Sequence, residues 1–273
     1  MKEIPVSVLM SVYFKDNPRF FEQSLDSIFN QTFMPNEIVI IKDGAITNSL
    51  NNVLSIYNRK KGIIKIVELE KNSGLGIALN HGLEHCTNEI VARMDADDIA
   101  RSDRLEKQYC YMCDHPDVSV LGAYVEEFEN EIGDLKKIRK TPQDANKVKV
   151  FSKYRNPLNH PSVMFRRNAV IKVGGYSDLL FFEDYYLWIN LLINNFIIVN
   201  LPEVLLYFRA DSEMMRRRQG FHYLKFELAF LKRIYQDRYI NIYEYVFLAT
   251  SKSFLRILPI PLLKFFYRTY LRK

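Results

Sequence analysis

The arrangement of apolar runs in the first hundred residues constrains the fold more than any other feature of this sequence. Four runs are apolar on both sides of an extended chain: Val6–Val12, Glu37–Ile41, Ile63–Leu69 and Ile90–Met94. Segments with apolar residues at helical spacing separate them: Phe20–Phe29, Asn51–Tyr57 and Ile77–His85. Buried strands that alternate with helices predict a parallel sheet with helices on both faces. We therefore expect an α/β fold.

The pattern changes after Asp98. A helix is expected over Asp103–Asp114, and Val118–Phe128 alternates like a half-exposed strand. The polar, basic stretch Gly133–Asn156 predicts loops or a short helix. The remaining expected elements are a short strand at Ser162–Phe165, a helix at Asp184–Ile193, short strands at Phe196–Leu201 and Leu205–Phe208, and helix from Phe221 to the end. We therefore expect a smaller second half and a helical tail.

Positive charge is concentrated at the C-terminus. From Arg209 onward there are 14 Lys/Arg and 5 Asp/Glu, whereas the whole chain carries a net charge of only +6. A basic tail predicts an anionic surface as partner, either membrane or nucleic acid. Three cysteines, an odd number, fit a reducing compartment. No apolar run reaches the roughly 18 residues of a spanning helix, and the N-terminus resembles a core strand more than a signal peptide.

Polar residues follow the predicted strands at the sheet edge where doubly wound folds bind ligands. They are Ser11 and Tyr13 after the first strand, Asp43 after the second, and Asp95, Asp97 and Asp98 after the fourth. Three carboxylates within four residues repel one another, and Mg²⁺ or Mn²⁺ would remove that cost. The alternative is a solvated acidic turn in which Asp98 or Ser102 caps a helix. The position after a buried strand favours the metal.

Two further segments carry candidate chemistry. Gly74 and Gly76 lie between the third strand and a helix, where a tight turn would let the backbone approach a nucleotide; an ordinary turn is the alternative. Leu79 stands at the last glycine position of a dinucleotide fingerprint, which disfavours a dehydrogenase. Glu183 and Asp184 begin a helix, where the helix dipole alone favours acids, but one of them could be a general base.

The ordered set of motifs resembles the family 2 glycosyltransferases over about residues 5–210. The matching segments are Val8-Leu-Met-Ser-Val-Tyr13, Ser27-Ile-Phe-Asn-Gln-Thr32, Lys42-Asp-Gly44, the glycine-rich run Asn72 to Gly82, Ala92-Arg-Met-Asp-Ala-Asp-Asp98, Asn159-His-Pro-Ser-Val-Met-Phe165, Gly174-Gly-Tyr176 and Glu183-Asp-Tyr-Tyr-Leu-Trp188. The resemblance implies a GT-A fold with a Rossmann-like nucleotide-binding sheet. It implies a nucleotide-sugar half over residues 1–100, an acceptor half over 101–215 and a basic amphipathic tail over 216–273.

The resemblance also implies roles for single residues. Ser11, Tyr13 and Asp43 would hold the uridine, Asp95 the ribose and metal region, and Asp97 the Mn²⁺ or Mg²⁺ that bridges the diphosphate. Asp184 would be the general base, supported by Glu183. His160 could be a base, a metal ligand or a phosphate contact, or only structural, and Arg209 and Arg217 are further candidates for phosphate or acceptor contacts. Asp211 stands where some members have a third metal ligand, a histidine.

The implied activity is inverting transfer of a hexose from a UDP-sugar, with UDP-glucose the first choice and UDP-galactose the second. The acceptor would be undecaprenyl-diphosphate-linked GlcNAc or GalNAc, in O-antigen or capsule assembly on the inner face of a bacterial plasma membrane. Aromatic and basic stripes from Leu263 to Arg272 fit a membrane-interface helix, or a helix packed on the body. A nucleotidyltransferase, a nucleic-acid-binding protein and an inactive binding module are the alternatives. No recognised nucleic-acid motif appears.

Overall fold

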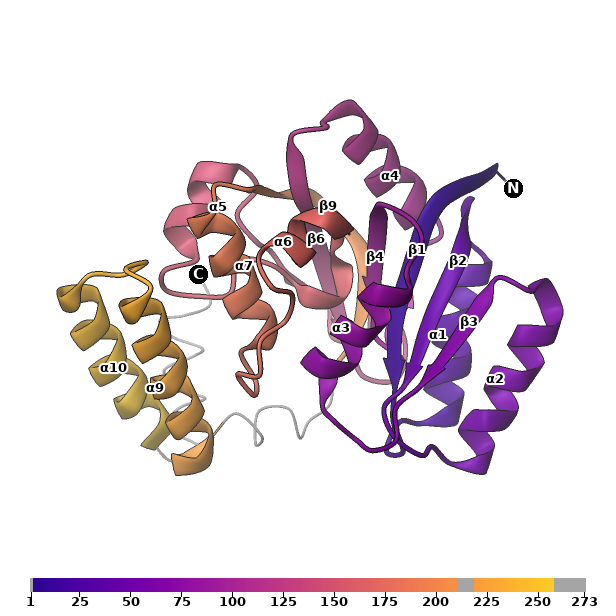
Figure 1. The fold of residues 1–273 in the computed structure, drawn as a ribbon, viewed down its shortest axis with the longest axis horizontal. Helices are drawn as coiled ribbons and strands as arrows, with labels where there is room; N and C mark the ends of the chain where they lie inside the picture. The colour runs from indigo at the N-terminus through magenta and orange to yellow at the C-terminus, as the bar shows by residue number, and fades with distance from the viewer. Residues whose placement is uncertain (1, 211–218, 258–273) are drawn as a thin grey trace. The chain divides into compact units, whose positions relative to one another are not determined.

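A computed structural model describes residues 2–210 and 219–257 of the chain (Figure 1). The described chain forms two compact units. Unit 1 contains residues 2–178 and 183–210, and unit 2 contains residues 179–182 together with residues 219–257. The predicted boundary between residues 215 and 216 lies outside the described residues.

A nine-stranded sheet organises unit 1, with the strand order β3-β2-β1-β4-β8-β6-β9-β5 and β7 paired to β6. The first four of these strands are parallel, as expected: β1 (Lys2–Val12), β2 (Phe33–Lys42), β3 (Ile64–Glu68) and β4 (Ile90–Met94). The chain builds outward from β1 to β3 and then returns to place β4 on the other side of β1. The β1–β4 boundary is therefore a topological switch point, where doubly wound sheets bind ligands.

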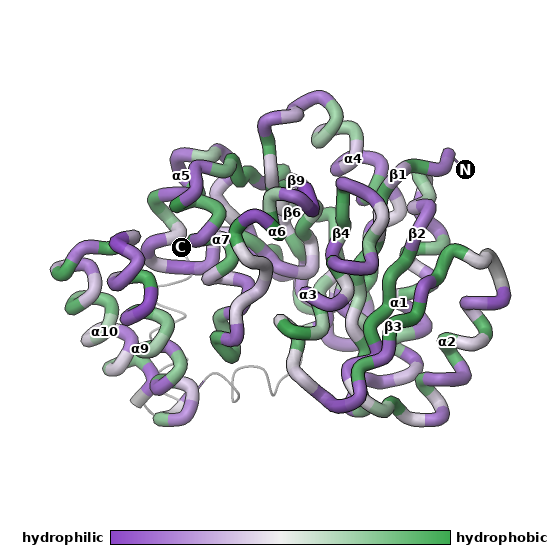
Figure 2. The backbone as a smooth tube through the Cα atoms, viewed as in Figure 1, coloured by the Kyte–Doolittle hydropathy of each residue, from purple (hydrophilic) through white to green (hydrophobic). Residues whose placement is uncertain are grey.

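Helices cover this parallel half on both faces, which confirms the second part of that prediction (Figure 1). One side of β1, including Val8 and Met10, packs with helices α1 (Pro18–Phe29), α2 (Asn48–Lys61) and α4 (Arg104–Asp114). Helix α3 (Leu75–His85) lies on the opposite face. There Gly82 touches the sheet so closely that an added Cβ would lie 2.3 Å from Leu9 Cδ1. Figure 2 shows the resulting hydrophobic strands between the more polar helices.

Local sequence signals account for the helix starts. Asn17 caps α1 by accepting a hydrogen bond from the Arg19 N–H, and Pro18 occupies the first helical position. Thr47 caps α2 in the same way, and Gly62 ends that helix in the left-handed conformation that suits glycine. Such caps contribute about 1 kcal/mol each, so most of the stability comes from the buried helix faces.

The second half of the sheet is mixed, because β6 and β9 pair in parallel while the shorter pairings are antiparallel. It contains β5 (Ile99–Ala100), β6 (Val118–Phe128), β7 (Lys137–Arg139), β8 (Met164–Arg166) and β9 (Ile197–Arg209), with the short helices α5 (Ala145–Phe151) and α6 (Arg167–Lys172), the 3-10 turn η1 (His160–Ser162) and α7 (Glu183–Ile193). The expectation that β6 is half-exposed was wrong, because nine of its eleven residues are buried between neighbours. The two expected strands after residue 196 are one bulged strand, β9.

Unit 2 is built around two helices, α9 (Gly220–Gln236) and α10 (Ile242–Ile257). The helical structure expected from Phe221 onward is confirmed as far as Ile257, although residues 237–241 divide it into two helices. Phe182 stacks on Phe230 of α9 with ring centroids 4.8 Å apart. Within the described ranges, none of the helices combines the length and apolarity required to cross a membrane. The predicted stripes from Leu263 to Arg272 lie outside those ranges.

Candidate active site

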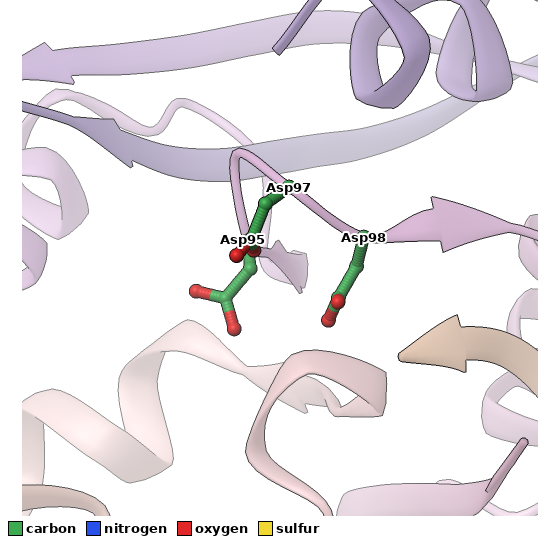
Figure 3. Close-up of side chains that lie close together, drawn as sticks. All are labelled: Asp95, Asp97 and Asp98. Atoms are coloured by element: carbon green, nitrogen blue, oxygen red, sulfur yellow. The ribbon is translucent and has the colours of Figure 1, made fainter. Parts of the chain in front are cut away.

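An acidic loop joins β4 to β5 at the switch point. Ligand oxygens of Asp95, Asp97 and Asp98 all lie within 4.8 Å of one another. Their side chains point to the same side of the loop in Figure 3. The strand predicted to end at Met94 thus delivers all three carboxylates to one place, as the D-x-D-D spacing indicates.

Two buried arginines support this loop from beneath. Arg93, 1% exposed, binds the Asp95 carboxylate through both terminal nitrogens, with 2.5 Å between Nη1 and Oδ2. Burial opposes the charge of Arg93, but Asp95 outweighs it and raises the guanidinium pKa. Arg104, fully buried, donates to the Arg93 carbonyl at 2.7 Å, and burial lowers its pKa to about 9. Asp95 is therefore held in place by a paired charge.

Asp98 is fully buried, so the alternative interpretation of a solvated, helix-capping turn is wrong for this residue. Its Oδ1 accepts the Arg209 N–H at 2.8 Å, whereas its Oδ2 has no hydrogen-bond partner among the described residues. Burial, followed by repulsion from Asp97 and Asp95, raises the Asp98 pKa well above its ordinary value.

Arg209, at the end of β9, holds the loop from the side. Its guanidinium lies 3.8 Å from the Phe20 ring centroid and 4.4 Å from that of Phe128. Its Nε donates to the Asp97 carbonyl at 2.9 Å, and Nη2 donates to Gln23. This arrangement makes Arg209 a support for the acidic loop, whereas sequence analysis proposed it as a phosphate or acceptor contact. Arg217 and Asp211 lie outside the described residues.

Asp16 is a fourth carboxylate at this edge that sequence analysis missed. Its Oδ2 accepts the Tyr13 N–H at 2.9 Å and closes the turn after β1. Burial raises the Asp16 pKa to about 7, and the charges of Asp97 and Asp95 add to the effect. Asp97 itself is solvent-accessible, yet crowding by protein atoms and the charge of Asp95 raise its pKa to about 6. A surplus of mutually repelling acids thus lines the site.

The uridine-binding residues predicted from the sequence lie at the ends of adjacent strands. Ser11 is paired in register with Ile41, which places it beside the end of β2, where Asp43 follows. Asp43 is 4% exposed, and its carboxylate accepts the Ser73 N–H at 2.7 Å and the Gly74 N–H at 3.0 Å. Asp43 therefore also braces the loop before α3.

The two glycines of that loop have different functions. Gly74 has a φ of 90°, which few other residues adopt, and its N–H faces Asp43. Gly76 allows close packing, because a Cβ there would lie 2.9 Å from the Ser177 carbonyl oxygen and 3.2 Å from Glu183 Cβ. Sequence analysis associated Gly76 with a nucleotide or an ordinary turn. Its neighbours instead belong to the segment that leads into α7.

The second acid pair begins α7, as predicted. Asn156 donates to Asp184 Oδ2 at 2.7 Å, and the Tyr185 N–H donates to Asp184 Oδ1 at 2.7 Å. Glu183 and Asp184 are both half-buried. The Asp184 carboxylate is therefore fixed in orientation by a side chain from outside its helix.

Tyr176 experiences the charges of both acid clusters. Its backbone N–H and carbonyl are both bound by the Asn80 side chain, at 2.8 Å each. The Tyr176 hydroxyl is within electrostatic range of Asp184, Glu183 and Asp95. His160 Nε2 lies 3.0 Å from that hydroxyl, and burial lowers the His160 pKa well below its ordinary value. His160 is thus a neutral partner of Tyr176, which fits the structural alternative.

The donor set of the acidic loop fits a hard divalent cation. All its donors are carboxylate oxygens, one of them the buried and unpartnered Oδ2 of Asp98, and Asp97 is open to solvent. Mg²⁺ and Mn²⁺ prefer oxygen ligands and commonly share them with substrate phosphates. Asp97 and Asp98 would hold the ion, and Asp95, which the sequence also assigns to the metal, belongs to the same group of ligand oxygens although Arg93 binds its carboxylate.

Arg93 and Tyr176 lie within the family-like motifs, but no function was predicted for either residue from the sequence. A signal for Arg93 was present, because it is the only charged residue in the buried run Ile90–Met94. Asp16 offered no comparable signal, since acids in exposed turns are common. Its significance depends on the distant acids that folding brings near it.

A parallel half with an acid cluster at its switch point, joined to a mixed half that carries a second acid pair, is the arrangement of a GT-A glycosyltransferase. Residues 7–179 match the family described as glycosyl transferase family 2, and the chain belongs to that family. It is therefore a transferase. Membership of this family disfavours the two alternatives of a nucleotidyltransferase and an inactive binding module.

One relative and two solved structures illustrate the likeness. An Escherichia coli protein named UDP-Gal:alpha-D-GlcNAc-diphosphoundecaprenol beta-1,3-galactosyltransferase is 38% identical over 267 residues, which cover 98% of this chain and 96% of the relative. Staphylococcus aureus TarS 1–349 in complex with UDP-GlcNAc has a TM-score of 0.67 at 17% identity, over 94% of this chain and 77% of that chain. The mannosyltransferase PcManGT from Pyrobaculum calidifontis, in complex with GDP-Man and Mn²⁺, has a TM-score of 0.64 at 19% identity, over 98% and 81%. The two structures share the GT-A fold with this chain.

Proposed function

We propose that this chain transfers galactose from UDP-galactose to a hydroxyl of an N-acetylhexosamine carried on undecaprenyl diphosphate. The observation that carries the proposal is the presence of two acid clusters, the loop of Asp95, Asp97 and Asp98 with ligand oxygens within 4.8 Å of one another, and Asp184 oriented by Asn156. One cluster suits a cation and a diphosphate, and the other suits proton removal from an acceptor.

Similarity to the E. coli relative changes the order of the two proposed sugar donors. Sequence analysis places UDP-glucose first and UDP-galactose second. The E. coli relative, which is similar along nearly the whole chain, is named for UDP-Gal and for a diphosphoundecaprenol-linked GlcNAc. This similarity supports UDP-galactose as the first donor and a lipid-linked GlcNAc as the first acceptor. Synthesis of O-antigen or capsule is the process we propose for the product.

The nucleotide would be held at the ends of β1 and β2. Tyr13 would stack on the uracil, Ser11 would contact the nucleoside, and Asp43 would accept a hydrogen bond from the base. Asp43 already accepts two backbone N–H groups, so its position is fixed before the donor arrives. Asp95, paired to Arg93, would contact the ribose.

The transfer itself is a single displacement. The acceptor hydroxyl gives its proton to Asp184 as its oxygen forms a bond to the anomeric carbon, and the bond from that carbon to the UDP oxygen breaks. Bound Mn²⁺ or Mg²⁺ would neutralise charge on the departing diphosphate. Attack from the face opposite the UDP inverts the anomeric centre, giving a β-linked product from an α-linked donor. Glu183 would support Asp184.

Purified protein, incubated with Mn²⁺ and a synthetic lipid diphosphate bearing GlcNAc or GalNAc, tests this proposal. We expect transfer from UDP-galactose and a β anomeric proton in the NMR spectrum of the product. UDP-glucose and the two N-acetylated donors serve as comparisons. Faster transfer from UDP-glucose would restore the order expected from sequence, whereas an α-linked product would contradict the single displacement.

The metal site has its own test. Asp97→Ala removes an accessible ligand without disturbing a buried contact of its carboxylate, so the fold should persist. We expect calorimetry to show loss of Mn²⁺-dependent UDP binding. Asp114→Ala, at an exposed acid in α4, is the control. Unchanged UDP affinity in Asp97→Ala would refute the assignment.

We also propose that the basic tail over residues 216–273 holds the protein on the inner face of the plasma membrane. A lipid-linked acceptor supports this location, because the sugar to be extended lies at the membrane surface. The surplus of positive charge after Arg209 would be attracted by anionic lipids.

A further inference from the structure

Helix α10 of unit 2 turns its basic residues toward α9 and its apolar residues toward solvent. Glu227 of α9 is 3% exposed, and Arg256 of α10 donates to both its oxygens, at 2.8 Å and 3.2 Å. Lys252 lies 3.5 Å from the same carboxylate. Arg256 also covers the Tyr223 ring, 4.6 Å from its centroid. Both basic residues of α10 are thus directed toward α9.

The opposite face of α10 is apolar and exposed. It presents Ile242, Tyr243, Val246, Phe247 and Phe254, of which Tyr243 is 84% exposed and Phe247 and Phe254 about 60%. Spacings of three and four residues place these side chains along one side of the helix, away from the buried Leu248. Along the described length of α10, this outer face contains no charged residue. Hydrophobic positions recur along the helix in Figure 2.

Helix α9 shows that this pattern is particular to α10. Its exposed side carries Lys225, Lys232 and Arg233, and its buried side carries apolar residues such as Leu231 and Ile234. That is the ordinary arrangement for a helix in water. A helix with apolar residues on both sides requires a second apolar surface to cover it.

We propose that the outer face of α10 inserts into the membrane interface and forms the apolar part of the membrane contact. The sequence that follows Ile257 directly carries Lys264, Arg268, Arg272 and Lys273, and no acid. An uncharged aromatic face followed by a basic segment complements an anionic lipid surface, which offers hydrocarbon below and negative headgroups above. Because Lys252 and Arg256 are directed toward Glu227 and the outer face carries no charged side chain, insertion of that face places no charge in the apolar layer.

This inference rests on the proposed membrane function, but it concerns the apolar face of α10 and not the basic residues of the same tail. The two contributions differ in their salt dependence. Attraction between a basic tail and lipid headgroups is screened by salt, whereas burial of Phe247 and Phe254 in the interface is not. The full chain should therefore retain vesicle binding at a salt concentration that abolishes purely electrostatic adsorption.

The test is flotation of the full chain with vesicles of phosphatidylglycerol and phosphatidylcholine at low and high salt. Phe247→Gln/Phe254→Gln keeps two helix-compatible residues but removes the apolar side chains. We expect this variant to lose roughly ten- to a hundredfold in vesicle partitioning, mostly at high salt. Ile56→Gln/Val150→Gln is the matched control, because those residues are 52% and 63% exposed on helices of unit 1. The control should partition like the parent.

Equal partitioning of the variant and the parent would overturn the proposal. A second outcome would also overturn it: the parent is a dimer, and the two substitutions convert it to a monomer without loss of vesicle binding. In that case a second copy of the chain, and not the membrane, covers α10. Mn²⁺-dependent UDP affinity, measured without lipid, shows whether each variant is folded. If the parent binds vesicles through α10 but transfers no sugar to the lipid acceptor, the proposed function fails while this inference stands.

Discussion

At the scale of single residues, the site contains more negative charge than its neighbours among residues 2–210 and 219–257 neutralise. Arg93 balances Asp95, and the Arg209 N–H binds Asp98, but Asp16 and Asp97 face one another's charge without a partner of that strength. Removing one member of a buried ion pair typically costs about 3–5 kcal/mol. Arg93 is therefore a support of the acidic loop whose loss should affect the whole site.

Asp16 gives the metal-free protein a defined pH dependence. The Asp16 pKa is about 7 in the folded protein, against an ordinary value of 3.8. The folded state then keeps a proton that the unfolded state releases, so the free energy of unfolding falls as the pH rises through this interval. Asp16→Asn retains an oxygen for the Tyr13 N–H. We expect it to match the parent near pH 4 and to be about 4 kcal/mol more stable near pH 8, because the folded and ordinary pKa values differ by about three.

Urea unfolding in EDTA at the two pH values measures this difference. Asp114→Asn, at an exposed acid, should show no such gain. Asp16→Asn should also weaken Mn²⁺–UDP binding if the turn charge assists the cation. A variant that is no more stable than the parent at pH 8 would refute the argument.

Asp184 and Glu183 can be separated by conservative substitutions. Asp184→Asn keeps the oxygen that accepts the Tyr185 N–H, but it cannot take a proton from the acceptor. A general base contributes roughly 10²–10⁴-fold to rate, so kcat should fall by that factor while UDP and metal binding persist. Glu183→Gln should lose less activity. If Glu183→Gln were the less active of the two, the general base would be Glu183.

At the scale of elements, helix α3 connects the two halves of unit 1. At its start, the Gly74 N–H donates to the Asp43 carboxylate. In its middle, the Asn80 side chain donates to the Tyr176 carbonyl. Gly76 has no side chain, so the chain before α7 packs closely against the helix. The glycine-rich segment resembles a nucleotide-binding turn in the sequence. In the structure it also packs against the segment that carries Glu183 and Asp184 in the second half of unit 1.

Gly76→Ala tests this interpretation. The added methyl would lie 2.9 Å from a backbone oxygen, so the chain near Ser177 must move. We expect a loss of about 1–3 kcal/mol in unfolding free energy, and a larger fall in kcat than in UDP affinity because Glu183 and Asp184 shift. Ile77→Ala, at an exposed neighbour on α3, is the control. A loss confined to UDP affinity would instead support direct contact of Gly76 with the nucleotide.

The elements that the sequence predicted well are those with one dominant signal. The four parallel strands and their helices were predicted from the spacing of apolar residues. The start of α1 at Asn17 and Pro18 is explained by a local hydrogen bond and by the fixed backbone angle of proline. Strand β6 was misjudged because its polar residues find partners inside the protein, as buried Glu127 does with Arg139. Pattern alone cannot distinguish a paired buried charge from a solvated one.

At the scale of the whole molecule, sequence analysis located the acids but not the contacts that fix them. The D-x-D-D segment, Asp43 and Asp184 were each predicted at strand or helix ends, where the structure places them. The stack of Arg209 between Phe20 and Phe128 joins three segments far apart in the chain. No periodicity or local motif reports such a contact, because it exists only after the sheet is complete.

The structure indicates where the C-terminal tail can be truncated. Removal of residues 240–273 would strip Lys252 and Arg256 from buried Glu227 and risk unfolding unit 2. Deleting residues 258–273 leaves that pair intact and removes four basic residues. We expect vesicle binding at low salt to fall roughly tenfold or more while UDP binding is unchanged. Undiminished low-salt binding would show that the charged contact lies elsewhere.

The hydrogen bond from the Arg209 N–H to Asp98 spans 111 positions of sequence. During synthesis the acids of the loop emerge from the ribosome long before the strand that fixes them. A nascent chain that has reached β8 therefore contains Arg93 to pair with Asp95 but lacks the Arg209 N–H that binds Asp98. We therefore expect a product of translation interrupted before β9 to have an incompletely fixed acidic loop and to transfer no sugar.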